Sequence, residues 1–444
     1  MKKVLIISTH FAPDIHVGAK RPTKICKYIP GNGWLPIVLT KQISDYHGID
    51  ETLYHNLINE VQIKRVRRWS INKLRNDNYK RIPNIINIKA DKYKILSLIK
   101  NTINYFVFYD YSWLIPGIIT ATKIIKKERI DIIFSTTPDP EALIAGLFLK
   151  LFTGKPFICE YRDRWTNQPV IFERSILHKK VNILLEKIIV KRADCIIVVT
   201  ELMKKTLIGN SNGKYNHKIH VIYNGYDRDD FKDVKGEDSP HCKKVFDINY
   251  VGTWGQSTSP MFFSAALKEL LTKYKYLNNK IRVNFVGEVK WDPVLKDQID
   301  SYIKDNELEG VFNWIEFLPH KEALRYLLNA NLLLLVIGQD KQKSDFYKHR
   351  VTSKLLEYLY VQRPILGLVP SDSEPAKIIR ECDAGEIVNP ENTEEIARAI
   401  YKMYYAWKEN KLHYEFEKVE ISKYDRRKQT KQLSAVFDSI AKKS

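Results

Sequence analysis

The stretch TSKLLEYLYVQRPILGL, residues 352–368, decides the fold class. Its leucines recur at helical spacing, and Pro364 marks the point where a helix has to end. The apolar run 365–368 follows at once, and a short run of this kind is typical of a strand that is covered on both faces. A helix that leads directly into a buried strand predicts a parallel sheet of alternating strands and helices.

The same alternation extends through the rest of the chain. Short runs dominated by Ile, Val, Leu and Phe are separated by longer helical patterns. In the first half we expect strands at 4–8, 36–40, 62–66, 130–135, 156–160, 195–200 and 220–223, and in the second half at 247–252, 282–287, 315–318, 332–337, 365–368 and 385–388.

A polar stretch at 227–245, rich in Asp and Lys, separates these two sets of strands. It has the composition of an interdomain linker. We therefore predict an N-terminal Rossmann-like domain over 1–226 and a C-terminal one over 246–421. Residues 422–444 show apolar side chains at helical spacing, and we expect a final helix there to pack back on the first domain.

The composition excludes several classes of protein. The chain has 444 residues, of which 44% are hydrophobic, and a formal net charge of +20, so it can build two real cores and its partners are expected to be acidic. Its five cysteines are scattered and never spaced as C-x-x-C, which favours a reducing cytosol over a disulfide framework or a zinc site. Because no nucleic-acid-binding motif accompanies the charge, nucleic acid is not expected as a partner.

Half of the charge excess lies in residues 61–100, where twelve basic residues stand against two acidic ones and give +10. This segment is either a solvated loop or a landing site for anionic lipid, at about 1 kcal/mol per basic residue near such a surface. The aromatic residues at 105–115 follow directly and favour the lipid alternative, which makes 61–115 a candidate peripheral membrane contact. The apolar stretch 100–123 is not expected to span a membrane, because Asp110 near its middle would cost about 2.5–3.5 kcal/mol.

At two places the sequence combines the end of a strand, the start of a helix and a basic residue. The loop after the first strand reaches Gly18 and Arg21, where a glycine permits close approach and a guanidinium can grip a phosphate at a helix N-terminus. In the second half, Ser353 can cap the helix that carries Lys354 and Glu357, a cation and a carboxylate that suit the phosphates and ribose of a nucleotide. Taken without their surroundings, these last two residues are more readily an ordinary surface ion pair.

The surrounding phrases resemble glycosyltransferase family 4, the retaining, metal-independent enzymes of the GT-B fold. The likeness extends over nearly the whole chain, and the phrases come in the family's order. They are 11–21, DIIFST at 131–136, EYRDRWT at 160–166, YNGYD at 223–227 with Phe231, INYVGT at 248–253, and SKLLEYL at 353–359 with PIL at 364–366.

The resemblance implies an α/β protein in which two Rossmann-like, doubly wound domains face each other across a cleft. The C-terminal domain would hold a nucleotide-sugar, with Glu357 on the ribose and Lys354 beside the diphosphate. The loop of Gly18, with Arg21 nearby, would lie under the diphosphate and the sugar. The transfer would be a front-face substitution with retention that needs no metal ion or cofactor, and a UDP-sugar is the expected donor.

The chain departs from the family at two places. The family's paired glutamates are spaced E-x7-E, but the position eight before Glu357 is His349, whose imidazole we expect to contact the sugar. The loop after the first strand of the C-terminal domain carries no base, although family members commonly have Arg and Lys there. We expect the phosphate charge to come from the 341–354 segment instead, which contains Lys341, Lys343, Lys348, Arg350 and Lys354.

Asp163 is the expected catalytic carboxylate on the acceptor side. It follows a predicted strand, at the sheet edge where α/β proteins bind ligands, and can orient an acceptor hydroxyl there. A structural ion pair with Arg162 or Arg164 explains it equally well. Four other polar residues are assigned no chemistry. His10 and His16 lie in a loop, where a histidine more often packs or caps a helix than catalyses a reaction. Asp139 and Glu141 are not matched with a second acid in the way that glycoside hydrolysis requires.

We therefore expect a glycosyltransferase that moves a hexosyl or N-acetylhexosaminyl group to a glycan or lipid-linked acceptor in cell-envelope polysaccharide biosynthesis. Its expected location is the cytoplasm, with peripheral association at the inner face of the membrane. Two alternatives stay open. A sugar-nucleotide epimerase or hydrolase of the same fold would turn over the donor without an acceptor. A non-catalytic sugar-nucleotide-binding protein would keep its biological activity after loss of Lys354 and Glu357.

Overall fold

The computed structural model describes residues 1–51, 57, 61–68, 112–166, 176–236, 244–253, 255, 258–287, 293–316, 318–338 and 347–442. These residues form two compact units. Unit 1 comprises Met1–Val199, Met203–Ile222 and Thr430–Ser444, and unit 2 comprises Thr200–Leu202 and Tyr223–Gln429. The main boundary thus follows Ile222, and the described part of the polar stretch 227–245 is counted with unit 2.

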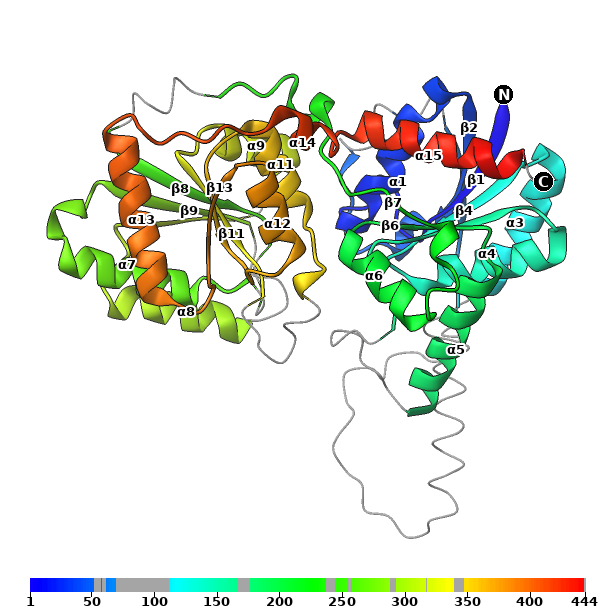
Figure 1. Cartoon of the computed structure of the whole chain (residues 1–444), viewed down its shortest axis with the longest axis horizontal. Helices are drawn as coiled ribbons and strands as arrows, with labels where there is room; N and C mark the ends of the chain where they lie inside the picture. The colour runs from blue at the N-terminus through cyan, green and yellow to red at the C-terminus, as the bar shows by residue number, and fades with distance from the viewer. Residues whose placement is uncertain are drawn as a thin grey trace, which may run out of the picture. The chain divides into compact units, whose positions relative to one another are not determined.

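Unit 1 is built on a parallel sheet whose described strands follow the order β3-β2-β1-β4-β5-β6-β7 (Figure 1). The strands are short and mostly apolar, as expected for strands that helical crossovers cover on both faces. Their bounds are β1 Lys2–Ile7, β2 Trp34–Lys41, β3 Gln62–Val66, β4 Ile132–Thr136, β5 Phe157–Tyr161, β6 Cys195–Val198 and β7 Ile219–Val221.

Successive side chains of β1 point to opposite faces of this sheet and join two different cores. Leu5 and Ile7 belong to the core formed with α3 (Leu114–Glu128), α4 (Pro140–Thr153), α5 (Ile176–Arg192) and α6 (Glu201–Asn210). Val4 and Ile6 belong to the core formed with α1 (Val17–Tyr28) and α15 (Arg426–Ala441). Unit 1 therefore has three layers, with helices on both faces of the sheet (Figure 1).

The C-terminal helix completes unit 1, as the sequence predicts. Leu433 and Phe437 of α15 are buried in the core shared with β1 and α1. The Phe437 ring lies with its centroid 5.4 Å from the rings of Trp34 and of Phe134. A short helix, α14 (Lys418–Ser422), precedes α15 in the chain.

Unit 2 repeats the same architecture on a second parallel sheet, with its described strands in the order β10-β9-β8-β11-β12-β13. One core holds α7 (Met261–Lys273), α8 (Pro293–Asp305) and α13 (Thr393–Lys408), and a second core holds α9 (His320–Leu328), α11 (Ser353–Val361) and α12 (Glu374–Glu381). The strand bounds are β8 Phe246–Val251, β9 Ile281–Val286, β10 Phe312–Ile315, β11 Leu332–Val336, β12 Ile365–Leu368 and β13 Gly385–Val388.

Each sheet has one point at which the order of its strands reverses. In unit 1 it lies between β1 and β4, which pair directly, and in unit 2 between β8 and β11. The loops that leave the carboxyl ends of these strands diverge to opposite faces, and the crevice between them is where open α/β sheets bind ligands. The two switch points are therefore the places at which to look for a site.

Every predicted strand overlaps a strand of the structure, but the prediction of 315–318 was wrong by three residues, since β10 begins at Phe312 rather than at 315. Phe312 and Trp314 pack their rings on Phe285 of β9, at centroid distances of 5.2 Å and 4.6 Å. This aromatic packing sets the register, and Pro319 precedes the next helix.

The predicted membrane contact 61–115 lies mostly outside the described residues, so it stays a prediction. The apolar stretch 100–123 enters the described part of the chain as the first half of α3. In the ranges that the structure describes, no helix combines the length and the apolar character needed to cross a membrane.

Candidate functional site

Five ionisable side chains meet at the switch point of unit 1. His10 and Asp14 lie in the loop after β1, Lys41 ends β2, and Asp139 and Glu141 lie at the start of α4. His10 Nδ1 is 2.5 Å from Asp14 Oδ2, and His10 Nε2 is 3.5 Å from Asp139 Oδ2. Lys41 Nζ is 2.5 Å from Asp139 Oδ2 and 3.2 Å from Glu141 Oε2. We call these five residues the unit 1 cluster.

The unit 1 cluster keeps the Asp139 carboxylate ionised. Burial alone would raise its pKa, but Lys41 and His10 outweigh burial and hold the pKa of Asp139 well below its ordinary value. Burial lowers the pKa of His10, and the hydrogen bonds to Asp139 and Asp14 reverse this, so its pKa is raised. Burial instead raises the pKa of Glu141 to about 7. The Asp139 side chain remains 33% exposed, so an ionised carboxylate faces solvent at the ligand-binding edge of the sheet.

Gly18 lies beside this cluster at the start of α1. Its N–H donates to His16 Nδ1 at 3.0 Å, and its carbonyl accepts from Arg162 Nη1 at 2.6 Å. A Cβ atom at this position would lie 2.7 Å from His16 Nδ1 and 3.0 Å from Pro138 Cδ, so a larger residue would have to displace these side chains. The predicted contact of Gly18 with a diphosphate stays a prediction, and the structure supplies a packing reason for the glycine.

Arg21 points into the protein from α1. Its Nε and Nη2 donate to Oε1 of Glu160 at 2.9 Å and 2.7 Å, and Nη2 also donates to the carbonyl of Ile222 at 3.0 Å. The side chains of Arg21 and Glu160 are 3% and 0% exposed, and the other Glu160 oxygen accepts from Thr136. The guanidinium thus has a structural partner, and the phosphate contact expected of Arg21 remains untested.

Asp163 lies just beyond β5, as predicted, and is exposed. Its neighbour Arg162 is buried, and burial lowers the pKa of the Arg162 guanidinium to about 10. Arg162 directs its side chain to Gly18, and its own N–H donates to Thr137 Oγ1 at 2.8 Å. Asp163 is therefore a second exposed carboxylate at the carboxyl-terminal edge of this sheet.

In unit 2 the decisive side chain is Lys354, in the first turn of α11. Its ammonium donates to the hydroxyl of Tyr250 and to the carbonyl of Thr253 at 3.3 Å, and it lies 4.2 Å from the centroid of the Tyr250 ring. Tyr250 belongs to β8, and Thr253 lies in the loop that follows it. Lys354 thus brings a cation into the loop whose sequence contains no base.

Gly252 makes room for this lysine. Its φ is +137°, and a Cβ atom there would lie 2.5 Å from Lys354 Cε and 2.8 Å from Nζ. Burial, together with the nearby positive charge of Arg350, lowers the pKa of Lys354 to about 7, although Glu357 opposes the shift. A cation that is held in a low-dielectric site beside backbone groups has a strong preference for an anionic ligand.

Glu357 follows one turn later on α11. Its Oε1 is 3.4 Å from Nε2 of His320, the first residue of α9, and its side chain is partly exposed. Sequence reasoning was wrong about the start of this helix: the N-cap is Thr352, which makes no capping hydrogen bond, and Ser353 is the first helical residue. We call Tyr250, Thr253, His320, Lys354 and Glu357 the unit 2 cluster.

The other predicted donor residues lie just before α11. Lys348 Nζ forms an ion pair with Asp372 Oδ2 at 2.5 Å, Arg350 is exposed, and His349 is buried. Lys341 and Lys343 lie outside the described residues. The roles of Lys348, His349 and Arg350 as ligands of a donor therefore stay predictions.

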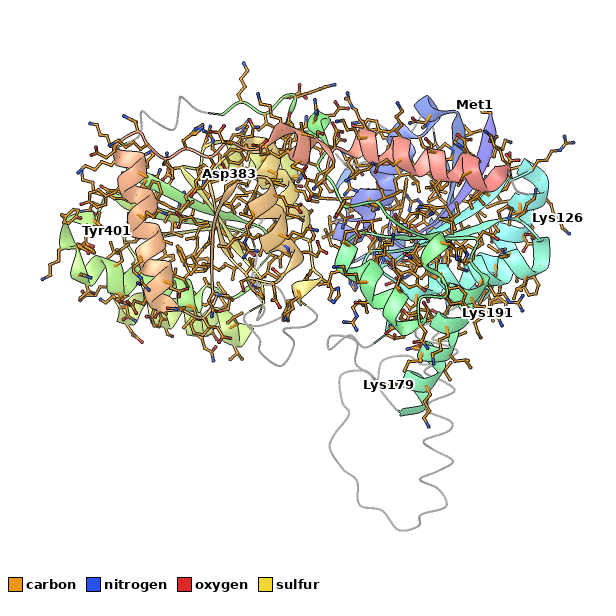
Figure 2. All side chains as sticks on the ribbon, in the orientation of Figure 1. Met1, Lys126, Lys179, Lys191, Asp383 and Tyr401 are labelled. Atoms are coloured by element: carbon orange, nitrogen blue, oxygen red, sulfur yellow. The ribbon has the colours of Figure 1, made fainter. Side chains whose placement is uncertain are left out.

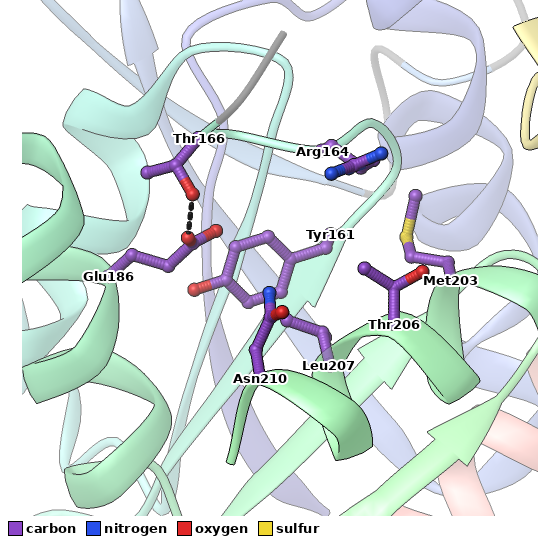
Figure 3. A pocket seen from close by; sticks show the side chains of 8 residues that line it. All are labelled: Tyr161, Arg164, Thr166, Glu186, Met203, Thr206, Leu207 and Asn210. Carbon is purple, nitrogen blue, oxygen red and sulfur yellow. Dashed lines mark hydrogen bonds between the residues drawn. The ribbon is translucent and has the colours of Figure 1, made fainter. Parts of the chain in front are cut away.

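A separate pocket opens between β5, α5 and α6 in unit 1 (Figure 3). The hydroxyl of Thr166 donates to Glu186 Oε2 there, and burial raises the pKa of Glu186. The pocket contains none of the predicted site residues, although three of its residues belong to the phrase 160–166. It is lined by Tyr161, Arg164, Thr166, Glu186, Met203, Thr206, Leu207 and Asn210.

Sequence reasoning missed Lys41, Asp139 and Tyr250. Lys41 could have been found from the sequence, because a lysine at the end of an otherwise apolar strand is expected to lie at the edge of the sheet. Asp139 and His10 are distant in sequence, and only the pairing of β1 with β4 brings them together. The sequence predicts Tyr250 as a core residue, because it lies in an otherwise apolar strand. Its hydroxyl has a polar role only because the Lys354 ammonium donates to it.

Three solved structures share the fold of the whole chain. HepE of Anabaena, in complex with UDP, superposes with a TM-score of 0.67 at 12% identity and covers 99% of this chain and 100% of its own. Sucrose-phosphate synthase of Thermosynechococcus elongatus gives 0.67 at 13% identity, with 100% of both chains covered. A glycosyltransferase from Rickettsia africae gives 0.66 at 14% identity, with 100% of this chain and 99% of its own covered.

A family model for Glycosyltransferase Family 4 matches residues 89–230. No curated protein sequence matches the chain. The family model confirms over residues 89–230 the resemblance that the sequence phrases indicate, and the two Rossmann-like units agree with the GT-B fold that it implies. The chain thus resembles glycosyltransferase family 4 through residues 89–230, and it shares a GT-B fold of two Rossmann-like units with these solved structures.

Proposed function

We propose that this protein is a retaining, metal-independent glycosyltransferase that transfers a hexosyl or N-acetylhexosaminyl group from a UDP-sugar. The acceptor we propose is a glycan or a lipid-linked glycan of cell-envelope polysaccharide biosynthesis. The single observation that carries the donor half of this proposal is the position of Lys354, whose ammonium lies over the Tyr250 ring at the switch point of unit 2.

The unit 2 cluster has the chemistry that a nucleotide diphosphate requires. Lys354 would face the diphosphate, and the partly exposed Glu357 carboxylate would accept hydrogen bonds from the ribose hydroxyls. The solved structures of HepE contain UDP, and UDP with glucose. As the bond to the sugar breaks, negative charge grows on the departing diphosphate, and a preorganised cation stabilises that charge more than it stabilises the intact donor.

The unit 1 cluster supports an acceptor role for this unit. Asp139 is ionised and partly exposed, and Asp163 is exposed at the end of β5. Either carboxylate can accept a hydrogen bond from an acceptor hydroxyl and so orient its oxygen for attack. The proton of that hydroxyl would pass to an oxygen of the departing diphosphate, as the family resemblance implies.

Thermal unfolding with candidate donors tests the proposal. A ligand at 100 times its dissociation constant stabilises the folded state by about 2.7 kcal/mol, so we expect a clear rise in Tm with the preferred UDP-sugar. GDP-, CMP- and dTDP-sugars serve as controls for the identity of the nucleobase. No shift with any UDP-sugar would contradict the proposal, and rapid turnover of the donor without an acceptor would favour an epimerase or hydrolase.

Glu357→Gln is expected to weaken the binding of UDP-glucose by about tenfold or more, because a hydrogen bond to a charged group contributes about 1.5–3 kcal/mol. Titration calorimetry measures the loss. Glu394→Gln is the matched control, because the Glu394 side chain is 70% exposed on α13 and is not part of the unit 2 cluster. Equal affinities for the two variants would argue against a ribose contact by Glu357.

The pH dependence of donor binding follows from the lowered pKa of Lys354. Its pKa is about 7, so the free protein carries the charge below pH 7 and loses it above. A neighbouring diphosphate favours the charged form, so binding above pH 7 has to take up a proton. From pH 7 to pH 8 the protonated fraction falls about fivefold, and we expect the affinity for UDP-glucose to fall by about the same factor.

Calorimetry in two buffers of different ionisation enthalpy measures this proton uptake directly at pH 8. UDP-glucose is the suitable ligand, because its diphosphate does not titrate near neutral pH. Lys354→Met should abolish the uptake. Uptake that persists in this variant would assign the proton to another group.

A further inference from the structure

Four tyrosine rings meet on the surface of unit 2, where the turn after α7 lies against the second half of α13. The Tyr274 ring stacks on that of Tyr401 at a centroid distance of 4.3 Å, and the Tyr401 ring lies 4.6 Å from that of Tyr405. The Tyr276 hydroxyl lies within hydrogen-bond distance of the hydroxyls of Tyr401 and Tyr405. We call these four residues the tyrosine patch, and Figure 2 labels Tyr401 on α13.

The tyrosine patch faces solvent, although packing fixes its rings. Tyr276 is 51% exposed, and the other three tyrosines are half-buried. The neighbouring Tyr404 is buried, and its ring lies 5.6 Å from that of Tyr405 and 5.8 Å from that of Phe246 in the core. An exposed group of large side chains that is already held in one geometry indicates a binding surface, because little side-chain entropy is lost when a ligand arrives.

Lysines surround the tyrosine patch. The segment 272–280, which contains two of the tyrosines, has three lysines and no acid. The ammonium groups of Lys273 and Lys408 lie over rings of the patch, at 5.4 Å and 5.7 Å from the ring centroids, and both side chains are exposed. Lys275 is exposed between the first two tyrosines. The local charge is therefore positive, and it favours an acidic ligand.

We propose that the tyrosine patch binds an anionic polysaccharide that carries carboxylate groups on its sugar rings. One face of a sugar ring consists of C–H groups, which pack on the negative face of an aromatic ring. The sugar hydroxyls exchange hydrogen bonds with the phenol hydroxyls, which both donate and accept. The lysines around the rings pair with the carboxylates.

Other partners fit the tyrosine patch less well. A membrane interface calls for exposed aliphatic side chains, whereas Leu270, Ile400 and Met403 of α7 and α13 are buried. A protein interface is depleted in lysine. A nucleic-acid strand stacks successive bases on aromatic rings, but the rings of Tyr274 and Tyr401 cover each other.

The tyrosine patch lies apart from the candidate donor site of the same unit. Tyr274 and Tyr276 shortly precede β9, and Tyr401 and Tyr405 lie in the second half of α13, which places the patch at the amino-terminal edge of the sheet. The unit 2 cluster lies at the carboxyl-terminal edge, where β8 ends. The inference therefore goes beyond the proposed sugar transfer and does not rest on it.

Binding of a fluorescent hyaluronan decasaccharide to the full chain, measured by thermophoresis, tests the proposal. Hyaluronan carries a carboxylate on every second sugar, and we expect it to bind more tightly than an uncharged dextran oligomer of the same length. Tyr276→Leu should weaken binding by about 5- to 10-fold, because an aromatic contact is lost. Tyr276→Phe keeps the ring and should stay within about threefold of the unmodified chain. The triple variant Lys273→Gln, Lys275→Gln, Lys408→Gln should weaken binding by about tenfold.

The matched control is Arg325→Gln, Lys377→Gln, Arg380→Gln, which removes three exposed basic residues from α9 and α12 on the other face of the sheet. Its affinity for hyaluronan should stay within about twofold of the unmodified chain. Circular dichroism should give the same Tm for all variants, because every changed side chain is exposed. The triple lysine variant leaves all four rings in place, so it tests the surface even if Tyr276→Leu lowers the Tm.

Four results would overturn the proposal. They are no binding of hyaluronan, equal affinity for poly-glutamate or oligothymidine of the same charge, equal losses for Tyr276→Leu and Tyr276→Phe, and a loss in the control that equals the loss in the triple lysine variant.

Discussion

Lys354→Met is expected to lower kcat/KM for the UDP-sugar by about 100-fold, the scale found when one preorganised group that stabilises developing charge is removed. Lys354 is the described cation that enters the loop after β8, and it reaches there because Gly252 leaves room for its side chain. Methionine has a similar length and no charge, so the packing over Tyr250 is kept while the charge is lost. The loss should therefore appear in KM as well as in kcat, because the cation stabilises the bound diphosphate and the diphosphate gains further charge in the transition state.

The fold should tolerate this change. Burial holds the pKa of Lys354 low, which means that the protein holds this charge at a cost, and an apolar replacement removes that cost. The free energy of unfolding is thus not expected to fall. Lys377→Met, at a largely exposed position on α12, is the control and should retain full activity. A kcat/KM that matches the control would rule out Lys354 as the group that stabilises the leaving diphosphate.

Glu160→Ala is expected to lower the free energy of unfolding of unit 1 by about 3–5 kcal/mol, the typical result of removing one partner from a buried ion pair. Burial would raise the pKa of Glu160, but Arg21 reverses this and the pKa lies below its ordinary value. Without Glu160, the Arg21 guanidinium stays buried and keeps its hydrogen bond to the Ile222 carbonyl, but it loses the carboxylate that neutralises its charge. Urea denaturation, followed through the transition of unit 1, measures the difference.

Two controls separate the structural from the catalytic role of this pair. Glu128→Ala removes a partly exposed ion pair with Lys3 and should cost at most about 1 kcal/mol. Arg21→Met with Glu160→Leu removes both charges and should recover most of the lost stability. If Arg21 also binds the donor diphosphate, this double variant will be stable and yet have a lower affinity for UDP-glucose. Unchanged affinity would leave Arg21 with its structural role alone.

Much of the fold could be predicted from local pattern. The apolar runs locate the strands because a strand of a covered parallel sheet has to be apolar on both faces. The predicted strand at 315–318 was misplaced because Ile315 and Leu318 are as apolar as Phe312. Only the packing of Phe312 and Trp314 on Phe285 decides which residues of this segment pair with β9. Helix starts also depend on local sequence, but Thr352 and Ser353 offer similar capping groups, so the sequence does not decide between them. In the structure Thr352 is the N-cap and precedes α11.

The candidate site could be predicted only in part. Lys354 and Glu357 are three residues apart on one helix, so their proximity follows from the helix period alone. The partners that give them their properties, Tyr250 and His320, come from β8 and α9 and could not be paired with them by sequence spacing. Arg21 shows the opposite case, because a base at a helix start suggested a phosphate ligand and the fold placed Glu160 beside it.

The sequence by itself determined two α/β units, the positions of their strands along the chain and the resemblance to glycosyltransferase family 4, because these depend on periodicity and on phrases that are contiguous in the chain. Tertiary structure alone decided which charges meet. Parallel pairing of β1 with β2 and β4 brings Lys41, His10 and Asp139 to one edge, and the contacts of α11 with the end of β8 bring Lys354 to Tyr250. The physical reason is that burial and charge pairing depend on distance in space, and a parallel sheet joins segments that are far apart in the chain.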